Sequence, residues 1–132
     1  MMSLKERLRL SGLKDNSGLN PEIRTIYKGD WIKNAQRTSD EHAAVGGSWK
    51  EYWQIFTLQD FPTKCPFCGE TLEEEDINGC HIKVSGPIIG KTAKTWSRKI
   101  YIIPGHHKCN MKLDAEFQAK INITAAEAIE KK

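Results

Sequence analysis

The sequence lacks the features that mark a membrane-embedded or exported protein. It has no run of about 18 apolar residues, so no segment is predicted to span a membrane. Its first residues, MMSLKERLRLSG, lack the apolar core of a secretory signal. Only four cysteines occur in 132 residues. We therefore expect a cytoplasmic protein in which paired cysteines bind a metal rather than form disulfides.

Neither sign of charge dominates the chain. The net charge is +3, the sequence pI is about 8.7, and 39% of the residues are hydrophobic. This balance permits contact with nucleic acid but does not demand it. The length fits one domain with a modest core, which a bound metal would help to stabilise.

Local patterns predict helices in the first 60 residues. The letters SLKE at residues 3–6 form a capping box, which opens a short helix that Gly12 could end. The letters NPE at residues 20–22 combine a side-chain cap with an early proline and predict a second helix, which Gly29 could close. Ser48 and Glu51 form another capping box. We expect residues 1–60 to be a helical N-terminal portion of the same domain as residues 61–132.

The helix predicted after Ser48 carries an aromatic stripe. Trp49, Tyr52, Trp53 and Phe56 lie at positions i, i+3, i+4 and i+7, which places them on one face. The stripe is predicted to pack against the C-terminal half. The alternative is a stacking platform for bases, which requires exposed rings.

Two short motifs predict a zinc site. The letters CPFCG at residues 65–69 form a knuckle whose two thiolates can bind one Zn²⁺ from a tight turn. The letters HHKC at residues 106–109 repeat the two-residue spacing and complete a closed tetrahedral set, as in structural zinc sites. The predicted ligands are Cys65, Cys68, His106 and Cys109. His107 or Cys80 could replace His106.

The C-terminal half has the composition of short strands and turns. The run KTWSRKIYII at residues 94–103 contains a β-prone stretch, and a short strand is predicted at about residues 117–123. A last helix is predicted to open at Thr124, with Glu127 three residues on. The expected fold class is α+β, with N-terminal helices packed on a zinc-stabilised module at residues 61–132.

Three segments resemble the HNH endonuclease superfamily, whose ββα-metal fold often carries a zinc site of paired knuckles. They are CPFCG, GCHI at residues 79–82 and IIPGHHKCN at residues 102–110, and they span about a third of the chain. More narrowly, the chain resembles small HNH-like proteins that read CxxC…GAH[IV]…YI[IV]PLCxxCN, with His106 at their third cysteine. The resemblance implies a ββα-metal module and a bacterial or phage setting.

The resemblance also implies a catalytic pair. In the family, a histidine on the first strand is the general base that activates water against a DNA phosphodiester, and His81 matches it. Asn110 matches the helix residue that binds one divalent ion such as Mg²⁺. The chain departs from the pattern at Cys80, which stands where an acidic ligand is usual, and at Tyr101, near the place of a central asparagine. His81 could instead be a structural residue or a zinc ligand, and Asn110 could satisfy local backbone groups.

Charged residues between the motifs leave two kinds of partner open. Basic residues near the predicted hairpin could contact DNA phosphates. They are Lys83, Lys91, Lys94, Arg98 and Lys99. The acidic letters EEED at residues 73–76 would instead suit a protein partner. We therefore expect a zinc-containing HNH-like nucleic-acid-binding protein that could act as a DNA endonuclease, with a catalytically inactive interaction or inhibitor protein as the alternative.

Overall fold

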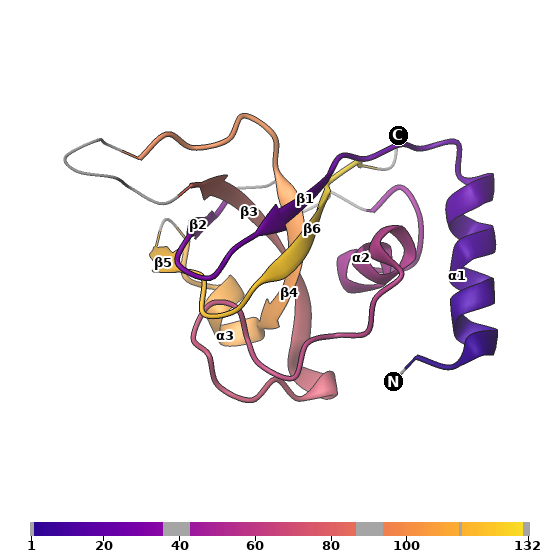
Figure 1. Cartoon of the computed structure of the whole chain (residues 1–132), viewed down its shortest axis with the longest axis horizontal. Helices are drawn as coiled ribbons and strands as arrows, with labels where there is room; N and C mark the ends of the chain where they lie inside the picture. Colours follow the sequence, from indigo (N-terminus) through magenta and orange to yellow (C-terminus); the bar gives the residue numbers. More distant parts are fainter. Residues whose placement is uncertain (1, 36–42, 87–93, 114, 131–132) are drawn as a thin grey trace.

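In the described part of the chain, the fold is built around one antiparallel sheet of six strands in the order β1-β6-β4-β3-β2-β5 (Figure 1). The computed structural model describes residues 2–35, 43–86, 94–113 and 115–130. The strands are β1 (Ile23–Ile26), β2 (Trp31–Asn34), β3 (Ile77–Ser85), β4 (Tyr101–His106), β5 (Glu116–Gln118) and β6 (Ile123–Glu127). The helices are α1 (Leu4–Asn16), α2 (Trp49–Thr57) and α3 (His107–Asn110), with a 3-10 turn at Glu74–Asp76. The predicted α+β class is confirmed.

Both capping boxes open helices, as predicted. The Ser3 hydroxyl accepts a hydrogen bond from the Glu6 backbone N–H at 3.1 Å, and the Ser48 hydroxyl accepts one from the Glu51 N–H at 3.2 Å. Helix α1 continues through Gly12 to Asn16, so the predicted end is wrong. Nothing lies within 4 Å of the place of a Cβ at Gly12, because this helix is mostly exposed along its length beside α2 (Figure 1).

The aromatic stripe of α2 forms the centre of the core. All four rings are buried, and the helix packs on β3, β4 and β6. The Tyr52 hydroxyl donates to the Glu127 carbonyl at 2.6 Å, and the Trp53 indole N–H donates to the Thr124 carbonyl at 2.7 Å. The stripe therefore packs on strands of the C-terminal half, as predicted, and its buried rings cannot serve as a stacking platform.

Two predicted helices are strands instead. The segment after Asn20 is β1, and the segment at Thr124 lies in β6. These strands pair with each other, so that Ile23 faces Ala126 and Thr25 faces Thr124. The letters that resemble helix starts act over a few residues, whereas this pairing joins segments about 100 residues apart, and tertiary pairing overrides the local preference. Strands from both sides of residue 60 thus share one sheet.

The hairpin of β3 and β4 leads directly into α3. Strand β4 extends beyond the predicted run, through Pro104 and Gly105 to His106. The strand predicted near residues 117–123 is split into β5 and the start of β6. No helix in the described part of the chain has the length and apolar character needed to cross a membrane.

Candidate metal centre

The CPFCG knuckle is a tight turn held by its own backbone. The Cys65 N–H donates to the Glu70 carbonyl and the Gly69 N–H donates to the Cys65 carbonyl, each at 2.8 Å. Gly69 has a φ of 79°, a left-handed conformation that glycine adopts without a steric penalty. The turn therefore presents Cys65 and Cys68 together, as the sequence predicts.

Phe67 anchors the knuckle to the sheet. Its side chain is 0% exposed and meets the Phe117 ring edge-on, with ring centroids 5.2 Å apart. A Cβ at Gly105 would lie 2.6 Å from Phe67 Cε2, so β4 has room for this ring only because residue 105 is glycine. Neither role was predicted, although a glycine inside a β-prone run is a signal of close approach.

The second pair of ligands comes from the junction of β4 and α3. His106 is the last residue of β4, and Cys109 lies in α3. Asn34 of β2 secures this short helix, because its side-chain amide donates to the Cys109 carbonyl at 2.7 Å and to the Lys112 carbonyl at 3.1 Å. Asn34 was also not predicted, since no motif in the sequence links it to residues about 75 positions away.

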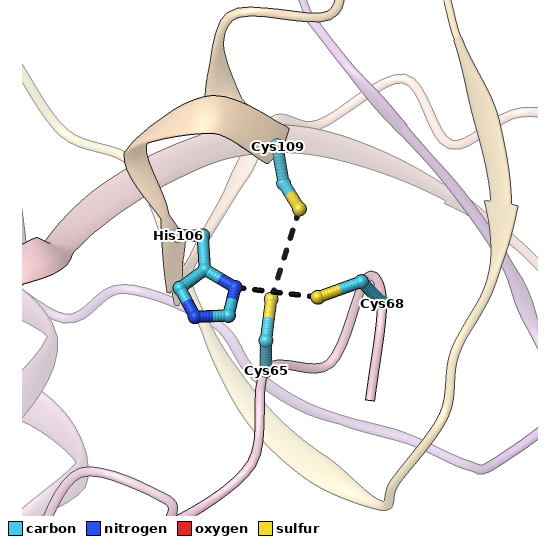
Figure 2. A group of neighbouring side chains, drawn as sticks. All are labelled: Cys65, Cys68, His106 and Cys109. Carbon is cyan, nitrogen blue, oxygen red and sulfur yellow. Dashed lines mark hydrogen bonds between the residues drawn. The ribbon is translucent and has the colours of Figure 1, made fainter. Parts of the chain in front are cut away.

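The four predicted ligands converge (Figure 2). One ligand atom from each of Cys65, Cys68, His106 and Cys109 lies within 4.8 Å of all the others. The sulfurs of Cys65 and Cys109 are 4.0 Å apart, and Cys68 Sγ is 3.2 Å from His106 Nδ1. Sulfurs about 2.3 Å from a tetrahedral zinc would be about 3.8 Å from each other. The group could therefore hold a metal ion and is consistent with structural zinc.

The two predicted substitutes for His106 lie outside this group. His107 Nδ1 is 2.8 Å from the side-chain amide nitrogen of Asn78. The Cys80 thiol is 3.6 Å from the Asn78 carbonyl. Neither side chain belongs to the cluster of four, so the structure favours His106 among the three alternatives.

A backbone contact fixes which nitrogen of His106 can bind a metal. His106 Nε2 is 2.8 Å from the Thr71 carbonyl oxygen, on the strand-like arm that follows the knuckle. A carbonyl can only accept, so Nε2 carries the proton and donates it. The lone pair of a neutral ring then lies on Nδ1, which faces the cysteines (Figure 2). A hydrogen bond from the second ring nitrogen is the usual way in which proteins orient a metal-binding histidine.

The pKa values of two of the clustered thiols are shifted in opposite directions, upward at Cys109 and downward at Cys68. Burial raises the pKa of Cys109 to about 12, and negative charge at Cys65 and Cys68 acts in the same direction. At Cys68 burial also acts to raise the pKa, but hydrogen bonds to its sulfur, of which the one from the Glu70 N–H is the largest, outweigh burial, and the pKa is lowered. Three thiolates this close would repel one another. A bound cation would relieve that repulsion and favour loss of the thiol protons.

His81 lies on the other face of β3 from the metal centre. It is 3% exposed, and its ring centroid is 4.5 Å from that of Trp49 in α2. The adjacent residue Cys80 points to the opposite face, where its sulfur is 3.3 Å from the place of a Cβ at Gly105, beside Phe67. Figure 1 shows α2 and α3 on opposite sides of the β3–β4 hairpin. The structure therefore does not bring His81 among the four clustered ligands.

Asn110 lines a surface hollow. The hollow has a volume of about 350 Å³. Its lining residues are Ser48, Trp49, Lys50, Ile77, Asn78, Gly79 and Asn110. Trp49 contributes to this wall and also contacts His81, which is not part of the lining. The two predicted catalytic residues thus lie near the same tryptophan, one beside the hollow and the other buried.

Three of the other positions singled out in the sequence, Tyr101, Lys94 and Lys99, have side-chain partners in the structure. The Tyr101 hydroxyl donates to Glu22, and Lys99 forms an ion pair with the same carboxylate at 3.4 Å. Lys94 forms an ion pair with Glu116 at 2.5 Å. Lys91 lies outside the described residues.

No family model, curated protein or solved structure matches this chain.

Proposed function

We propose that the chain is a zinc-containing HNH-like protein that binds nucleic acid through a module made of the knuckle, β3, β4 and α3. The observation that carries the proposal is the convergence of three thiols and one imidazole from the two motifs that define the resemblance. The chain order supports it, because an antiparallel hairpin leads directly into a helix. These are the elements that a ββα-metal module requires.

The zinc in this proposal is structural. Four protein ligands complete a tetrahedral shell and leave no open position for water or substrate. Its role is to join the knuckle, which is local in sequence, to the β4–α3 junction about 40 residues later. The zinc thus fixes the position of α3 and, with it, that of Asn110.

DNA cleavage is the more specific form of the proposal. In it, Asn110 would contribute its amide oxygen to a second divalent ion at the hollow, and His81 would take a proton from the attacking water. Lys50, which also lines the hollow, would neutralise charge on the phosphate. Because His81 is buried against Trp49, its action as a base requires the indole to move aside.

A second candidate is a catalytically inactive HNH-like module that binds a protein. Two observations favour it. Trp49 packs directly on the candidate base, and Cys80 at the position of the usual acidic ligand faces the knuckle side of β3. In this alternative the same zinc-stabilised scaffold would act as an interaction or inhibitor protein.

A plasmid-nicking assay separates these candidates. Zinc-loaded protein would be incubated with supercoiled plasmid and Mg²⁺, Mn²⁺ or Ni²⁺, alongside His81→Ala, Asn110→Ala and the control Asn20→Ala, whose side chain is exposed. A nuclease that uses these residues nicks with wild type and the control, and loses activity in the other two variants. Zinc content should stay at wild-type level in all variants, because neither His81 nor Asn110 belongs to the ligand cluster.

The assay has two further outcomes. Equal nicking by all four proteins would identify a contaminant. Absence of nicking by wild type would reject the nuclease, and absence of any binding to labelled duplex or single-stranded DNA would then favour the protein-binding alternative.

A further inference from the structure

A surface of alternating tryptophans and lysines lies where β2 begins and β3 ends. We call it the Trp–Lys surface and define it by Trp31, Lys33, Lys83, Lys94 and Trp96. Trp31 and Lys33 are two residues apart in β2 and so lie on the same face of the sheet. Lys83 of β3 faces Lys33 across the strand pair. The surface therefore begins as a row of side chains on two paired strands.

The segment that precedes β4 adds the other two residues. The Thr95 N–H donates to the Ser85 hydroxyl at 3.2 Å, and the Ser97 N–H donates to the Val84 carbonyl at 2.8 Å. The Ser97 hydroxyl also accepts from the Val84 N–H at 3.1 Å. These contacts hold residues 94–97 along the end of β3 and fix the positions of Lys94 and Trp96.

Each tryptophan of this surface is covered by a lysine ammonium. Lys94 Nζ is 4.1 Å from the centroid of the Trp31 ring, and Lys33 Nζ is 4.6 Å from that of Trp96. Both rings are only half-buried, unlike the indoles of α2. A planar ligand group can displace a lysine ammonium from the face of a tryptophan ring. The flexible lysine side chain can rotate away while its charge stays near the ring.

The surface carries an excess of positive charge. Lys33 and Lys83 lie directly opposite each other, an arrangement of like charges that destabilises a strand pair in the absence of a ligand. Neither forms an ion pair with another described residue. Glu116 pairs with Lys94 and faces Lys33 in the register of β2 with β5. Three lysines and one glutamate leave a net charge of +2 beside two aromatic rings.

We propose that the Trp–Lys surface binds single-stranded nucleic acid, with bases stacked on Trp31 and Trp96. The proposal rests on the nucleic-acid binding proposed above and assigns it a location. On binding, a base replaces each ammonium over its ring, and the lysines turn to the phosphates of the same strand. Stacking of a base on an aromatic ring contributes more than an exposed cation–π contact, so the exchange is favourable.

The combination of groups favours a single strand over other acidic ligands. Base faces in a duplex are already stacked on one another and cannot cover the indoles. An acidic peptide without aromatic residues, such as poly-glutamate, would pair with the lysines but has no flat group to take their place on the rings. Unpaired bases on a phosphate backbone use both the charge and the rings.

The test is the affinity of the full-length, zinc-loaded protein for a fluorescein-labelled oligothymidine of 15 nucleotides, measured by anisotropy. Trp96→Ala should weaken binding about tenfold, and Trp96→Phe much less, because a phenyl ring still stacks. The double variant Lys33→Gln/Lys83→Gln should weaken binding and reduce the slope of log K against log salt by about 0.7 per lysine. The matched control is Lys5→Gln/Lys14→Gln on exposed α1, which should change neither quantity.

Several results would overturn the proposal. The first is that wild type does not bind the oligonucleotide. The second is that Trp96→Ala, with a wild-type thermal melt, binds it as tightly as wild type does. The others are that wild type binds a duplex of the same length more tightly than the single strand, or that poly-glutamate competes as well as unlabelled oligothymidine does. The nicking assay is independent of this outcome. Loss of nicking in His81→Ala with unchanged oligonucleotide affinity would support both proposals, whereas absence of nicking would leave the Trp–Lys surface as a binding site without cleavage.

Discussion

The two faces of the β3–β4 hairpin are built in different ways, and adjacent residues show the difference. Cys80 faces the knuckle and lies beside Gly105 and Phe67, whereas His81 faces α2 and contacts Trp49. The knuckle face carries a group of four side chains, supplied by two short motifs, that could hold a metal ion. The α2 face depends on apolar packing by a helix that precedes β3 by about 20 residues. A compact motif such as GCHI therefore contributes to two environments that should respond differently to substitution.

The largest expected difference comes from removing one clustered thiol. Cys65→Ser should prevent ordered folding of the knuckle and the β4–α3 junction, because metal binding in structural zinc sites supplies roughly 10–16 kcal/mol of apparent free energy in small peptides. Loss of one equivalent of zinc and a much lower thermal midpoint by circular dichroism would be the expected result.

Cys80→Ser is the matched control for that experiment. Cys80 is buried on the same face but lies outside the ligand cluster. The Cys80→Ser protein should keep its zinc. Its free energy of unfolding should fall by about 1–3 kcal/mol, the cost of burying a hydroxyl in place of a thiol. Equal loss of zinc in the two variants would place Cys80 among the ligands and contradict the geometry described above.

A smaller effect should follow from filling the space at Gly105. A methyl group there would overlap the Phe67 ring, since the Cβ position is 2.6 Å from it, so Gly105→Ala should cost about 1–3 kcal/mol by overpacking. Chemical denaturation of the zinc-loaded protein measures this cost. The control Gly12→Ala adds a methyl group in open space inside a helix and should be neutral or stabilising. An unchanged Gly105→Ala protein would mean that Phe67 is not held against β4.

The cluster of four candidate ligands could be predicted because the pattern that indicates it is local in the sequence. Each motif places two ligands with two residues between them, a spacing that lets both reach one ion, so all four clustered residues were identified from the sequence. The contacts that support them are long-range. Asn34 reaches the Cys109 carbonyl from β2, and Thr71 orients His106 through its backbone, a contact that does not depend on the identity of the side chain.

The fold was predicted where local and tertiary preferences agree. Helix α2 begins at its capping serine and buries the stripe predicted for it. The helices predicted at β1 and β6 were wrong because both segments satisfy local helix-start rules, whereas in the sheet β1 pairs with β6 and β6 also pairs with β4. The helices expected at residues 20–29 and after Thr124 are therefore strands. Their pairing is long-range, and local sequence patterns do not reveal it.

The catalytic prediction for His81 and Asn110 differs in kind from the metal prediction. It depends on where two residues about 30 positions apart lie relative to an ion and a phosphate, and spacing does not determine such geometry. In the structure Asn110 lines a hollow, and His81 is buried against the Trp49 ring. The role of both residues stays a prediction for the nicking assay.

The smallest effect is expected on the α2 face, where Tyr52 joins the helix to β6. Its hydroxyl donates to the Glu127 carbonyl and accepts from the Ile129 N–H at 3.1 Å. Tyr52→Phe should therefore cost about 1 kcal/mol at pH 7.

Burial raises the pKa of Tyr52 to about 12, above the value of about 10 expected in the unfolded chain. Its contribution is then complete below pH 10 and declines as the pH rises toward 12. Denaturation at pH 7 and pH 11 should show a smaller difference between Tyr52→Phe and wild type at the higher pH, while Tyr27→Phe, at an exposed position, should show none at either. A constant difference would mean that the hydroxyl is open to water and that this face is less tightly closed than the knuckle face.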